Sequence, residues 1–298
     1  MAQSIDLAYL IEVNSSSLNK VVSTKDGALN VIEWLRGGVK SRLHYEQIRP
    51  YVAALASCGA YQVYSLPAEL TIHRARYLND NKWPESVAEL GPPPVHTVTE
   101  FGRCNQPKQP LWYCSLYEDT ALAEINAELA AQYVVASFTL QKDIRLIRVG
   151  DFDYYRRTGN TSIGEADPLS VKAYKEICDK DDRIIPAVID AFLADEFIKP
   201  ATSHTDYKIT CAFSDVLLSG ELKPSQPIDA IIYPSVAFRH GLNFAIRPEA
   251  YPSKLTLVEA ETKIIEITDV VGYGIFDYRK LATLKPVSSQ EILHWDAA

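Results

Sequence analysis

LWYCSLYEDTALAEINAELAAQYVVASFTL, residues 111–140, carries the change of periodicity that decides the fold. It opens with four apolar and aromatic residues, which predict a short buried strand. Ser115 stands three residues before Glu118, the spacing of a capping box, and predicts a helix over residues 119–132. The run YVVASFTL, residues 133–140, predicts a second strand. Strand, helix and strand therefore follow one another within this segment.

Elements on the C-terminal side are predicted from the same kind of periodicity. Three helices are expected, over residues 170–180, 183–199 and 207–219. Strands are also expected, the last two joined by a short turn, over residues 144–150, 228–235 and 242–248. Apolar and polar residues alternate in residues 254–278 and predict further β structure. The order of elements fits an α+β fold and not a regular βαβ alternation.

The N-terminal side has a helical pattern. VVSTKDGALNVIEWLRGG, residues 21–38, places apolar residues at helical spacing after a Lys-Asp-Gly turn, and its glycine pair ends the run. HYEQIRPYVAALASCGA, residues 44–60, predicts a further helix in which Pro50 is a kink or a fresh start and the last glycine is a stop. We expect residues 1–65 to form a helical N-terminal segment packed on the rest of the chain, and residues 66–298 to form the main domain.

Composition and charge exclude several classes of function. The chain has 298 residues, a formal net charge of −8 and no dense run of Lys or Arg, so the electrostatic footprint of a nucleic-acid binder is missing. No run approaches the roughly 18 apolar residues of a membrane helix. The N-terminus lacks the basic start and long apolar run of a secretory signal, so residence in the cytoplasm is expected.

Motifs for metals, phosphate loops and hydrolases are absent from the sequence. The five cysteines are odd in number and have no C-x-x-C spacing, which suits neither a disulfide framework nor a zinc site. No two histidines stand three or four residues apart, and H-E-x-x-H is missing, so no metal site is expected. The Walker and Rossmann glycine motifs and the G-x-S-x-G of many hydrolases are also missing.

One arginine continues the apolar face of the strand predicted by ELTIHRARY, residues 69–77. Period-two alternation places Leu70, Ile72 and Arg74 on one face, together with Arg76. A buried charge on such a face is unfavourable unless it meets an anion or a carboxylate. Arg74 is therefore either a clamp for a phosphate or carboxylate, or an arginine that has reached solvent at the strand end.

A glutamate stands apart from the apolar stripe of the predicted helix. Leu122, Ile125 and Leu129 form the expected core stripe, and Glu124 points nearly opposite to it. The plain interpretation is a solvated helix face that Glu124 shares with Glu128. The functional interpretation is that this face lines a cleft.

Two loop segments add polar candidates. FGRCNQP, residues 101–107, contains Arg103 and Asn105, which can hold a phosphate or a ribose hydroxyl, although such residues are equally common in plain turns. Ser235 follows Pro234, which cannot donate a ladder hydrogen bond, so strand pairing breaks there. Ser235 therefore faces either a cleft or an ordinary turn.

Taken in order, these segments resemble the RES domain family, which is named for its Arg, Glu and Ser. The order is HRAR, FGRCN, LWYCSLYEDTALAE, IDAIIYPS and LNFAI. The resemblance spans residues 66–250, with the core motifs in 70–250. Arg74, Glu124 and Ser235 fall on the three defining positions. The short aromatic strand followed by x-A-L-A-E is the most specific part.

Two departures from the family pattern concern residues beside the motifs. Cys104 occupies the variable position of the Gly-Arg-x-Asn loop, where relatives often carry an aromatic residue. Ala75 follows Arg74, where some relatives carry an aromatic residue. Residues 1–65 also exceed what the minimal domain needs.

The resemblance implies a fold, an activity and a set of site residues. It implies an ADP-ribosyltransferase-like split β core with flanking helices and NAD+ in a central cleft. The implied catalytic residues are Arg74, Glu124 and Ser235. The residues implied to bind NAD+ are Arg74, Arg103, Asn105, Tyr233 and Asn243. The implied activity is NAD+ degradation by phosphorolysis or hydrolysis, with ADP-ribosyl transfer to protein as an alternative and a non-catalytic RES-fold binding protein as another.

The resemblance also implies partners. Many members are toxins that an antitoxin neutralises, so an antitoxin or immunity protein is an expected partner, and a homo-oligomer stays open. NAD+ enters as a substrate, with inorganic phosphate as a candidate co-substrate and no separate cofactor. Breaking the nicotinamide–ribose bond develops positive charge at the anomeric carbon, which a carboxylate such as Glu124 can stabilise. Nicotinamide leaves as a neutral base, which fits the lack of a paired acid.

Overall fold

The structure is a computed structural model with an α+β fold. It describes residues 15–38, 41–66, 68–160, 168–178, 183–222, 227–238, 240–251, 253–287 and 291–298. The chain divides into two compact units, and we name them the helical unit and the sheet unit. The helical unit comprises residues 1–63, 100–107 and 147–228. The sheet unit comprises residues 64–99, 108–146 and 229–298.

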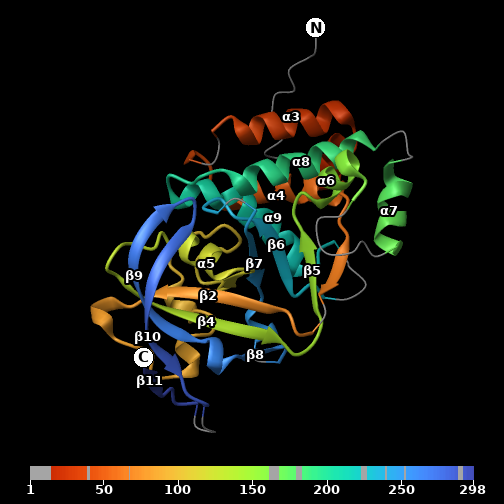
Figure 1. The fold of residues 1–298 in the computed structure, drawn as a ribbon. Helices are drawn as coiled ribbons and strands as arrows, with labels where there is room; N and C mark the ends of the chain where they lie inside the picture. Colours follow the sequence, from red (N-terminus) through yellow and green to blue (C-terminus); the bar gives the residue numbers. More distant parts are fainter. Residues whose placement is uncertain are drawn as a thin grey trace. The chain divides into compact units, whose positions relative to one another are not determined.

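The helical unit contains the N-terminal helices together with four helices from the middle of the chain. Its helices are α2 (Ser15–Val22), α3 (Lys25–Arg36), α4 (Tyr45–Ser57), α6 (Asp151–Thr158), α7 (Pro168–Cys178), α8 (Ile184–Ile198) and α9 (Lys208–Ser219), with the 3₁₀ turn η5 (His204–Tyr207). Helix α4 packs against α2 and α9, and α3 packs against α8 (Figure 1). The helices expected in these regions are confirmed. Positions 1–14, 39–40 and 179–180 of the expected helical segments lie outside the described residues.

The start of α3 corrects one sequence prediction. The Lys-Asp-Gly triplet is the first turn of the helix and not a turn before it. Thr24 is the N-cap, and its side chain accepts a hydrogen bond from the Gly27 N–H at 3.1 Å. A Cβ at Gly27 would lie 1.9 Å from the carbonyl oxygen of Val21, so the glycine is needed for close approach to the end of α2.

Helix α6 was not predicted, and a buried carboxylate from α8 caps it. Gly150 and Gly159 flank the helix in left-handed conformations, with φ of 80° and 73°. Asp190 is 1% exposed, and its two oxygens accept the N–H groups of Gly150 at 3.2 Å and Asp153 at 2.8 Å. The glycines at both ends of α6 are the signal that the sequence offered for this helix. A capping carboxylate 37 residues away cannot be found from local sequence.

The sheet unit is built on one large sheet. Its strands are β1 (Val63–Leu66), β2 (Thr71–Tyr77), β3 (Trp112–Ser115), β4 (Gln132–Leu140), β5 (Ile144–Arg148), β6 (Ala230–Pro234), β7 (Leu242–Ile246), β8 (Leu255–Leu257), β9 (Lys263–Gly272), β10 (Ile275–Leu284) and β11 (Trp295–Ala297). The strand order is β1-β5-β6-β7-β3-β2-β4-β9-β10-β11, and β8 pairs with β4. Short 3₁₀ turns lie between them: η2 (Asn79–Asn81), η3 (Val87–Glu89), η4 (Val95–Thr97), η6 (Pro248–Ala250) and η7 (Glu259–Glu261).

The sheet has a weak seam between β2 and β3. These strands share one register pair, His73 with Ser115, whereas β2 pairs with β4 along its whole length. In Figure 1, β2 and β4 run across the direction taken by β6 and β7. The expected α+β class is therefore confirmed, and the seam is consistent with a split β core.

Helix α5 (Glu118–Glu124) covers one face of β2, and its length differs from the prediction. Its buried Leu122 packs with Ala75 of β2 and Val135 of β4. The expected capping box is absent, because Ser115 ends β3 and Tyr117 is the N-cap without a side-chain hydrogen bond. The helix has seven residues and stops at Glu124, not at residue 132.

The predicted core stripe of this helix is wrong beyond Leu122. Ile125 and Leu129 are 37% and 63% exposed, because the chain has left the helix before them. Ala130 donates its N–H to the carbonyl of Ile267 at 2.9 Å, so the backbone here is bound to β9. Ala130 reaches this position with a φ of 61°. Tertiary hydrogen bonding has overridden the helical propensity of this segment.

The first prediction concerns residues 1–65. A chain that begins at residue 66 should be insoluble or much less stable than the full chain, because α8 and α9 then lose the apolar surfaces of α3 and α4. Soluble yield and thermal unfolding followed by circular dichroism compare the two chains. A well-folded, fully active shortened chain would show instead that the segment is a separable module.

The second prediction concerns Asp190. Burial raises its pKa to about 7 despite its two backbone hydrogen bonds, and the nearby Asp151 and Asp153 raise it further. Between about pH 4 and about pH 7 the folded chain then binds a proton that the unfolded chain releases, so this group's stabilisation falls as pH rises. The variant D190N has no titrating carboxyl at this position, so its free energy of unfolding should lack this pH dependence. Parallel curves of unfolding free energy against pH for both proteins would contradict the assignment.

Candidate functional site

Three elements of the sheet unit converge on the carboxylate of Glu124. Glu124 is the last residue of α5, and its Oε1 accepts two hydrogen bonds. Ser235, directly after β6, donates from Oγ at 2.6 Å, and Asn243 of β7 donates from Nδ2 at 2.7 Å. These residues lie 111 and 119 positions from Glu124 in the sequence. We name Glu124, Ser235, Asn243 and Ser115 the Glu124 cluster.

Ser115 fixes the orientation of the asparagine amide. Ser115 and Asn243 are register partners on β3 and β7, so their side chains lie on the same face. The Ser115 Oγ donates to the Asn243 Oδ1 at 2.7 Å, and both residues are buried. The amide oxygen is therefore occupied, and the nitrogen must face Glu124. The sequence prediction used Ser115 as a helix cap and missed this role.

A tight loop holds Ser235 in place. Its Oγ accepts the Phe238 N–H at 2.9 Å while it donates to Glu124, and its own N–H donates to the Gly241 carbonyl at 2.8 Å. A Cβ at Gly241 would lie 2.7 Å from side-chain atoms of Thr120, so the glycine allows the loop to approach α5. The hydroxyl proton and one acceptor lone pair of the serine are therefore in use. Ser235 is therefore a donor to a carboxylate and not a nucleophile activated by histidine.

The second carboxylate oxygen of Glu124 remains available. None of the residues that the structure describes donates a hydrogen bond to Oε2, and the side chain is partly exposed. Two short hydrogen bonds to an ionised acceptor are stronger than neutral ones and hold Oε1 in place. The arrangement presents one oriented oxygen, with negative charge, to a small molecule that reaches it.

Arg74 does not join the Glu124 cluster. Alternation along β2 places Arg74 on the face opposite to His73 and Ala75, and α5 covers the face of Ala75. The Arg74 Nη1 is buried and finds no hydrogen-bond partner among the described residues. Burial and the charge of Arg76 lower the pKa of Arg74 to about 9. The structure therefore does not bring Arg74 together with Glu124, and among the described residues no carboxylate pairs with this desolvated cation.

Arg103 and Asn105 lie in the helical unit, so the structure does not assign them to the Glu124 cluster. The Arg103 guanidinium donates to the carbonyl of Phe197 at 2.7 Å and also reaches that of Lys199. It stacks on the ring of Tyr207 at 5.0 Å. The last carbonyls of a helix have no donor from the helix itself, which explains why a guanidinium binds there. The roles of Arg103 and Asn105 toward NAD+ remain predictions.

Tyr233 stands beside the Glu124 cluster on β6. It is the register partner of Asn243 and is 4% exposed. Its backbone position therefore fits the predicted site. The role of its ring toward NAD+ remains a prediction.

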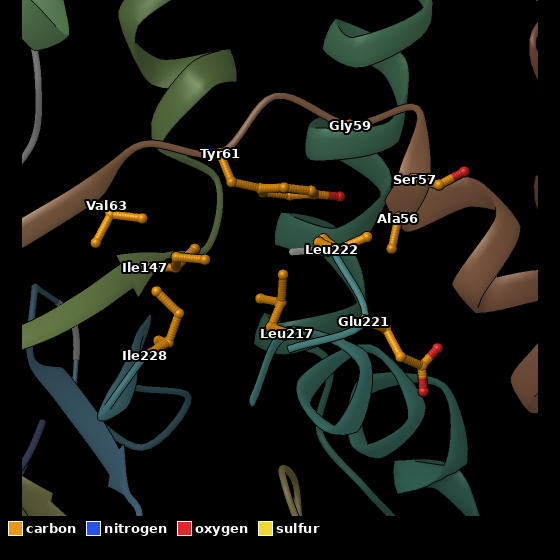
Figure 2. Close-up of a pocket in the computed structure, with 10 residues that line it drawn as sticks. All are labelled: Ala56, Ser57, Gly59, Tyr61, Val63, Ile147, Leu217, Glu221, Leu222 and Ile228. Atoms are coloured by element: carbon orange, nitrogen blue, oxygen red, sulfur yellow. The ribbon is translucent and has the colours of Figure 1, made fainter. Parts of the chain in front are cut away.

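The helical unit contains a pocket, and none of the residues that line it belongs to the Glu124 cluster. It has a volume of about 470 Å³, and Figure 2 shows the Tyr61 ring above aliphatic side chains such as Leu217 and Ile147. None of the predicted site residues lines it. In the described ranges, no group of His, Cys, Asp and Glu is arranged to hold a metal ion, and no helix could cross a membrane. None of the five cysteines, all of which lie in described ranges, forms a disulfide bond.

Comparison with known proteins identifies one family. The RES domain family matches residues 69–263, a range that contains Arg74, Glu124 and Ser235. No curated protein and no solved structure matches the chain. The family match covers more than half of the sequence and includes α5 with the strands around it. The chain therefore belongs to the RES domain family.

Proposed function

We propose that this protein consumes NAD+ by cleaving the bond between nicotinamide and ribose. The observation that carries the proposal is the Glu124 carboxylate, whose Oε1 is held by Ser235 and Asn243 while Oε2 has no donor among the described residues. Membership in the RES family, which is associated with NAD+-processing enzymes, supports the same chemistry.

The geometry suits a bond cleavage that develops positive charge. As the glycosidic bond breaks, its electron pair leaves with nicotinamide, and the anomeric carbon becomes oxocarbenium-like. The free oxygen of Glu124 would stabilise that charge or hold a ribose hydroxyl. Because nicotinamide departs neutral, no general acid is needed. Ser235 and Asn243 keep the carboxylate from turning, so little reorganisation is required during the reaction.

The acceptor that completes the reaction distinguishes three candidates. Attack by phosphate gives ADP-ribose 1″-phosphate, and attack by water gives ADP-ribose and a proton. Transfer to a protein side chain would make the chain an ADP-ribosyltransferase instead. A toxin neutralised by an antitoxin is the biological setting we propose. Incubating the protein with NAD+, with and without phosphate, and separating the products tests these outcomes, and a binding protein would yield no nicotinamide.

The third prediction concerns Glu124→Gln. Glutamine retains an oxygen for Ser235 and Asn243, so the free energy of unfolding should change by no more than about 0.5 kcal/mol. Nicotinamide release from NAD+ should fall by about 100-fold or more, because the charge on the oxygen is lost. Glu128→Gln, on the exposed segment just beyond α5, is the control and should keep full activity. Near-normal turnover by Glu124→Gln would refute the assigned role.

The fourth prediction concerns Arg74→Met. Arg74 is a buried cation whose Nη1 has no hydrogen-bond partner among the described residues, so its removal should leave the unliganded chain as stable as before or more stable. If Arg74 binds the pyrophosphate of NAD+, the dissociation constant should rise by about tenfold or more. Binding to the inactive Glu124→Gln background, measured by calorimetry, separates the two effects. Unchanged affinity together with lost stability would mean that Arg74 is purely structural.

A further inference from the structure

A second charged cluster lies at the opposite end of α5 from Glu124. Glu118 is the first residue of the helix, and its Oε2 accepts a hydrogen bond from the Lys263 Nζ at 2.7 Å. Lys263 also donates to the Tyr278 hydroxyl at 2.8 Å, and that hydroxyl lies 3.4 Å from the same Glu118 oxygen. His73 Nδ1 lies 4.0 Å from Glu118 Oε1 and 3.0 Å from the Ser137 Oγ. We name these five residues the Glu118 cluster.

The Glu118 cluster is half-buried, so its central ion pair is only partly screened. The side chains of Lys263 and Glu118 are 17% and 26% exposed. Burial opposes the charge on Lys263, but hydrogen bonds to Glu118 and Tyr278 outweigh it and raise the Lys263 pKa. The lysine therefore remains charged and bound. It connects α5 to β9, and the Tyr278 hydroxyl extends the connection to β10.

Helix α5 is too short to fix its own position. A helix of seven residues has no independent stability in water, and this one lacks a side-chain N-cap. Leu122 and Ala121 hold its middle by apolar contact with the sheet. Its first residue is bound through Glu118 and its last through Glu124. A shift at the first residue would therefore move the carboxylate at the other end, against the donors that orient it.

We propose that Lys263 is a positioning residue that acts through Glu118 and α5 to aim the Glu124 carboxylate at the substrate. The inference rests on the proposed function. Lys263 contacts no residue of the Glu124 cluster among the hydrogen bonds and ion pairs of the described residues, so its effect must travel along α5. Its removal should therefore affect the chemical step more than substrate binding.

The fifth prediction compares Lys263→Met with a matched control in the sheet unit. Lys254 pairs with Asp229 at 2.6 Å, with side chains 26% and 17% exposed, so Lys254→Met removes an ion pair of similar burial away from α5. Lys263→Met should lower kcat for NAD+ by about tenfold and change KM by less than about twofold. Lys263→Arg, which keeps the positive charge, should retain most of the kcat of the unaltered chain. Lys254→Met should keep kcat even if it lowers the melting temperature.

The pH profile gives a readout that lost stability alone would not produce. Burial lowers the pKa of His73. The charges of Glu118 on α5 and Glu261 of η7 raise this pKa, and the charge of Lys263 on β9 lowers it. Without Lys263, His73 should protonate more easily and supply a positive charge to Glu118. Burial, the largest influence, still holds the His73 pKa below its ordinary value of about 6.5, so turnover by Lys263→Met should recover as the pH falls below about 6.5. The double variant Lys263→Met, His73→Gln should show no recovery.

The outcomes separate this inference from the proposed function. If the unaltered chain turns over NAD+ but Lys263→Met has the kcat of Lys254→Met, the positioning role is overturned. If the unaltered chain releases no nicotinamide, the proposed function fails. Hydrogen exchange then tests by itself whether Lys263 holds α5 in position. Amides of residues 116–127 should then exchange faster in Lys263→Met than in Lys254→Met, and equal exchange would overturn it.

Discussion

The pair of hydrogen bonds to Glu124 Oε1 is the constraint on which the site depends. A carboxylate at the end of a seven-residue helix would otherwise rotate freely at the surface. Donors from the end of β6 and from β7 fix one oxygen, and Ser115 on β3 fixes the asparagine that supplies one of those donors. The register of β3, β6 and β7 therefore determines the position of this one oxygen atom. A shift of one residue between β3 and β7 would turn Asn243 to the other face and undo the arrangement.

The sheet supports this constraint through its seam. Strands β2 and β3 share a single register pair, and α5 spans this region with Leu122 packed on the face of Ala75. The helix is connected at both ends to opposite sides of the seam: Glu118 binds Lys263 on β9, and Glu124 binds residues beside β6 and on β7. The side-chain contacts of Glu118 and Glu124 thus connect the two sides of the sheet where backbone pairing between β2 and β3 is sparse. The exposed end of the helix carries the charge that the proposed chemistry requires.

Much of the fold and the centre of the site could be predicted from the sequence. Strand alternation around Arg74, the aromatic strand before α5 and the Tyr-Pro-Ser at the end of β6 are local signals, and motif order connected Glu124 with Ser235. Ser115 could not be placed correctly, because its capping-box spacing is the same whether its hydroxyl caps a helix or binds Asn243. The early end of α5 arises from hydrogen bonding to β9, which no local pattern encodes. The contact of the Arg103 guanidinium with the Phe197 carbonyl of α8, 94 positions away, has no local sequence signal either.

The most direct measurement of the central claim is a crystal structure of Glu124→Gln with NAD+ bound. The nicotinamide-bearing ribose should lie within hydrogen-bonding distance of the side chain at position 124, on the side away from Ser235 and Asn243. Both donors should still contact the other terminal atom of that side chain, as they contact Oε1 here. NAD+ bound elsewhere with the Glu124 cluster unoccupied would contradict the account.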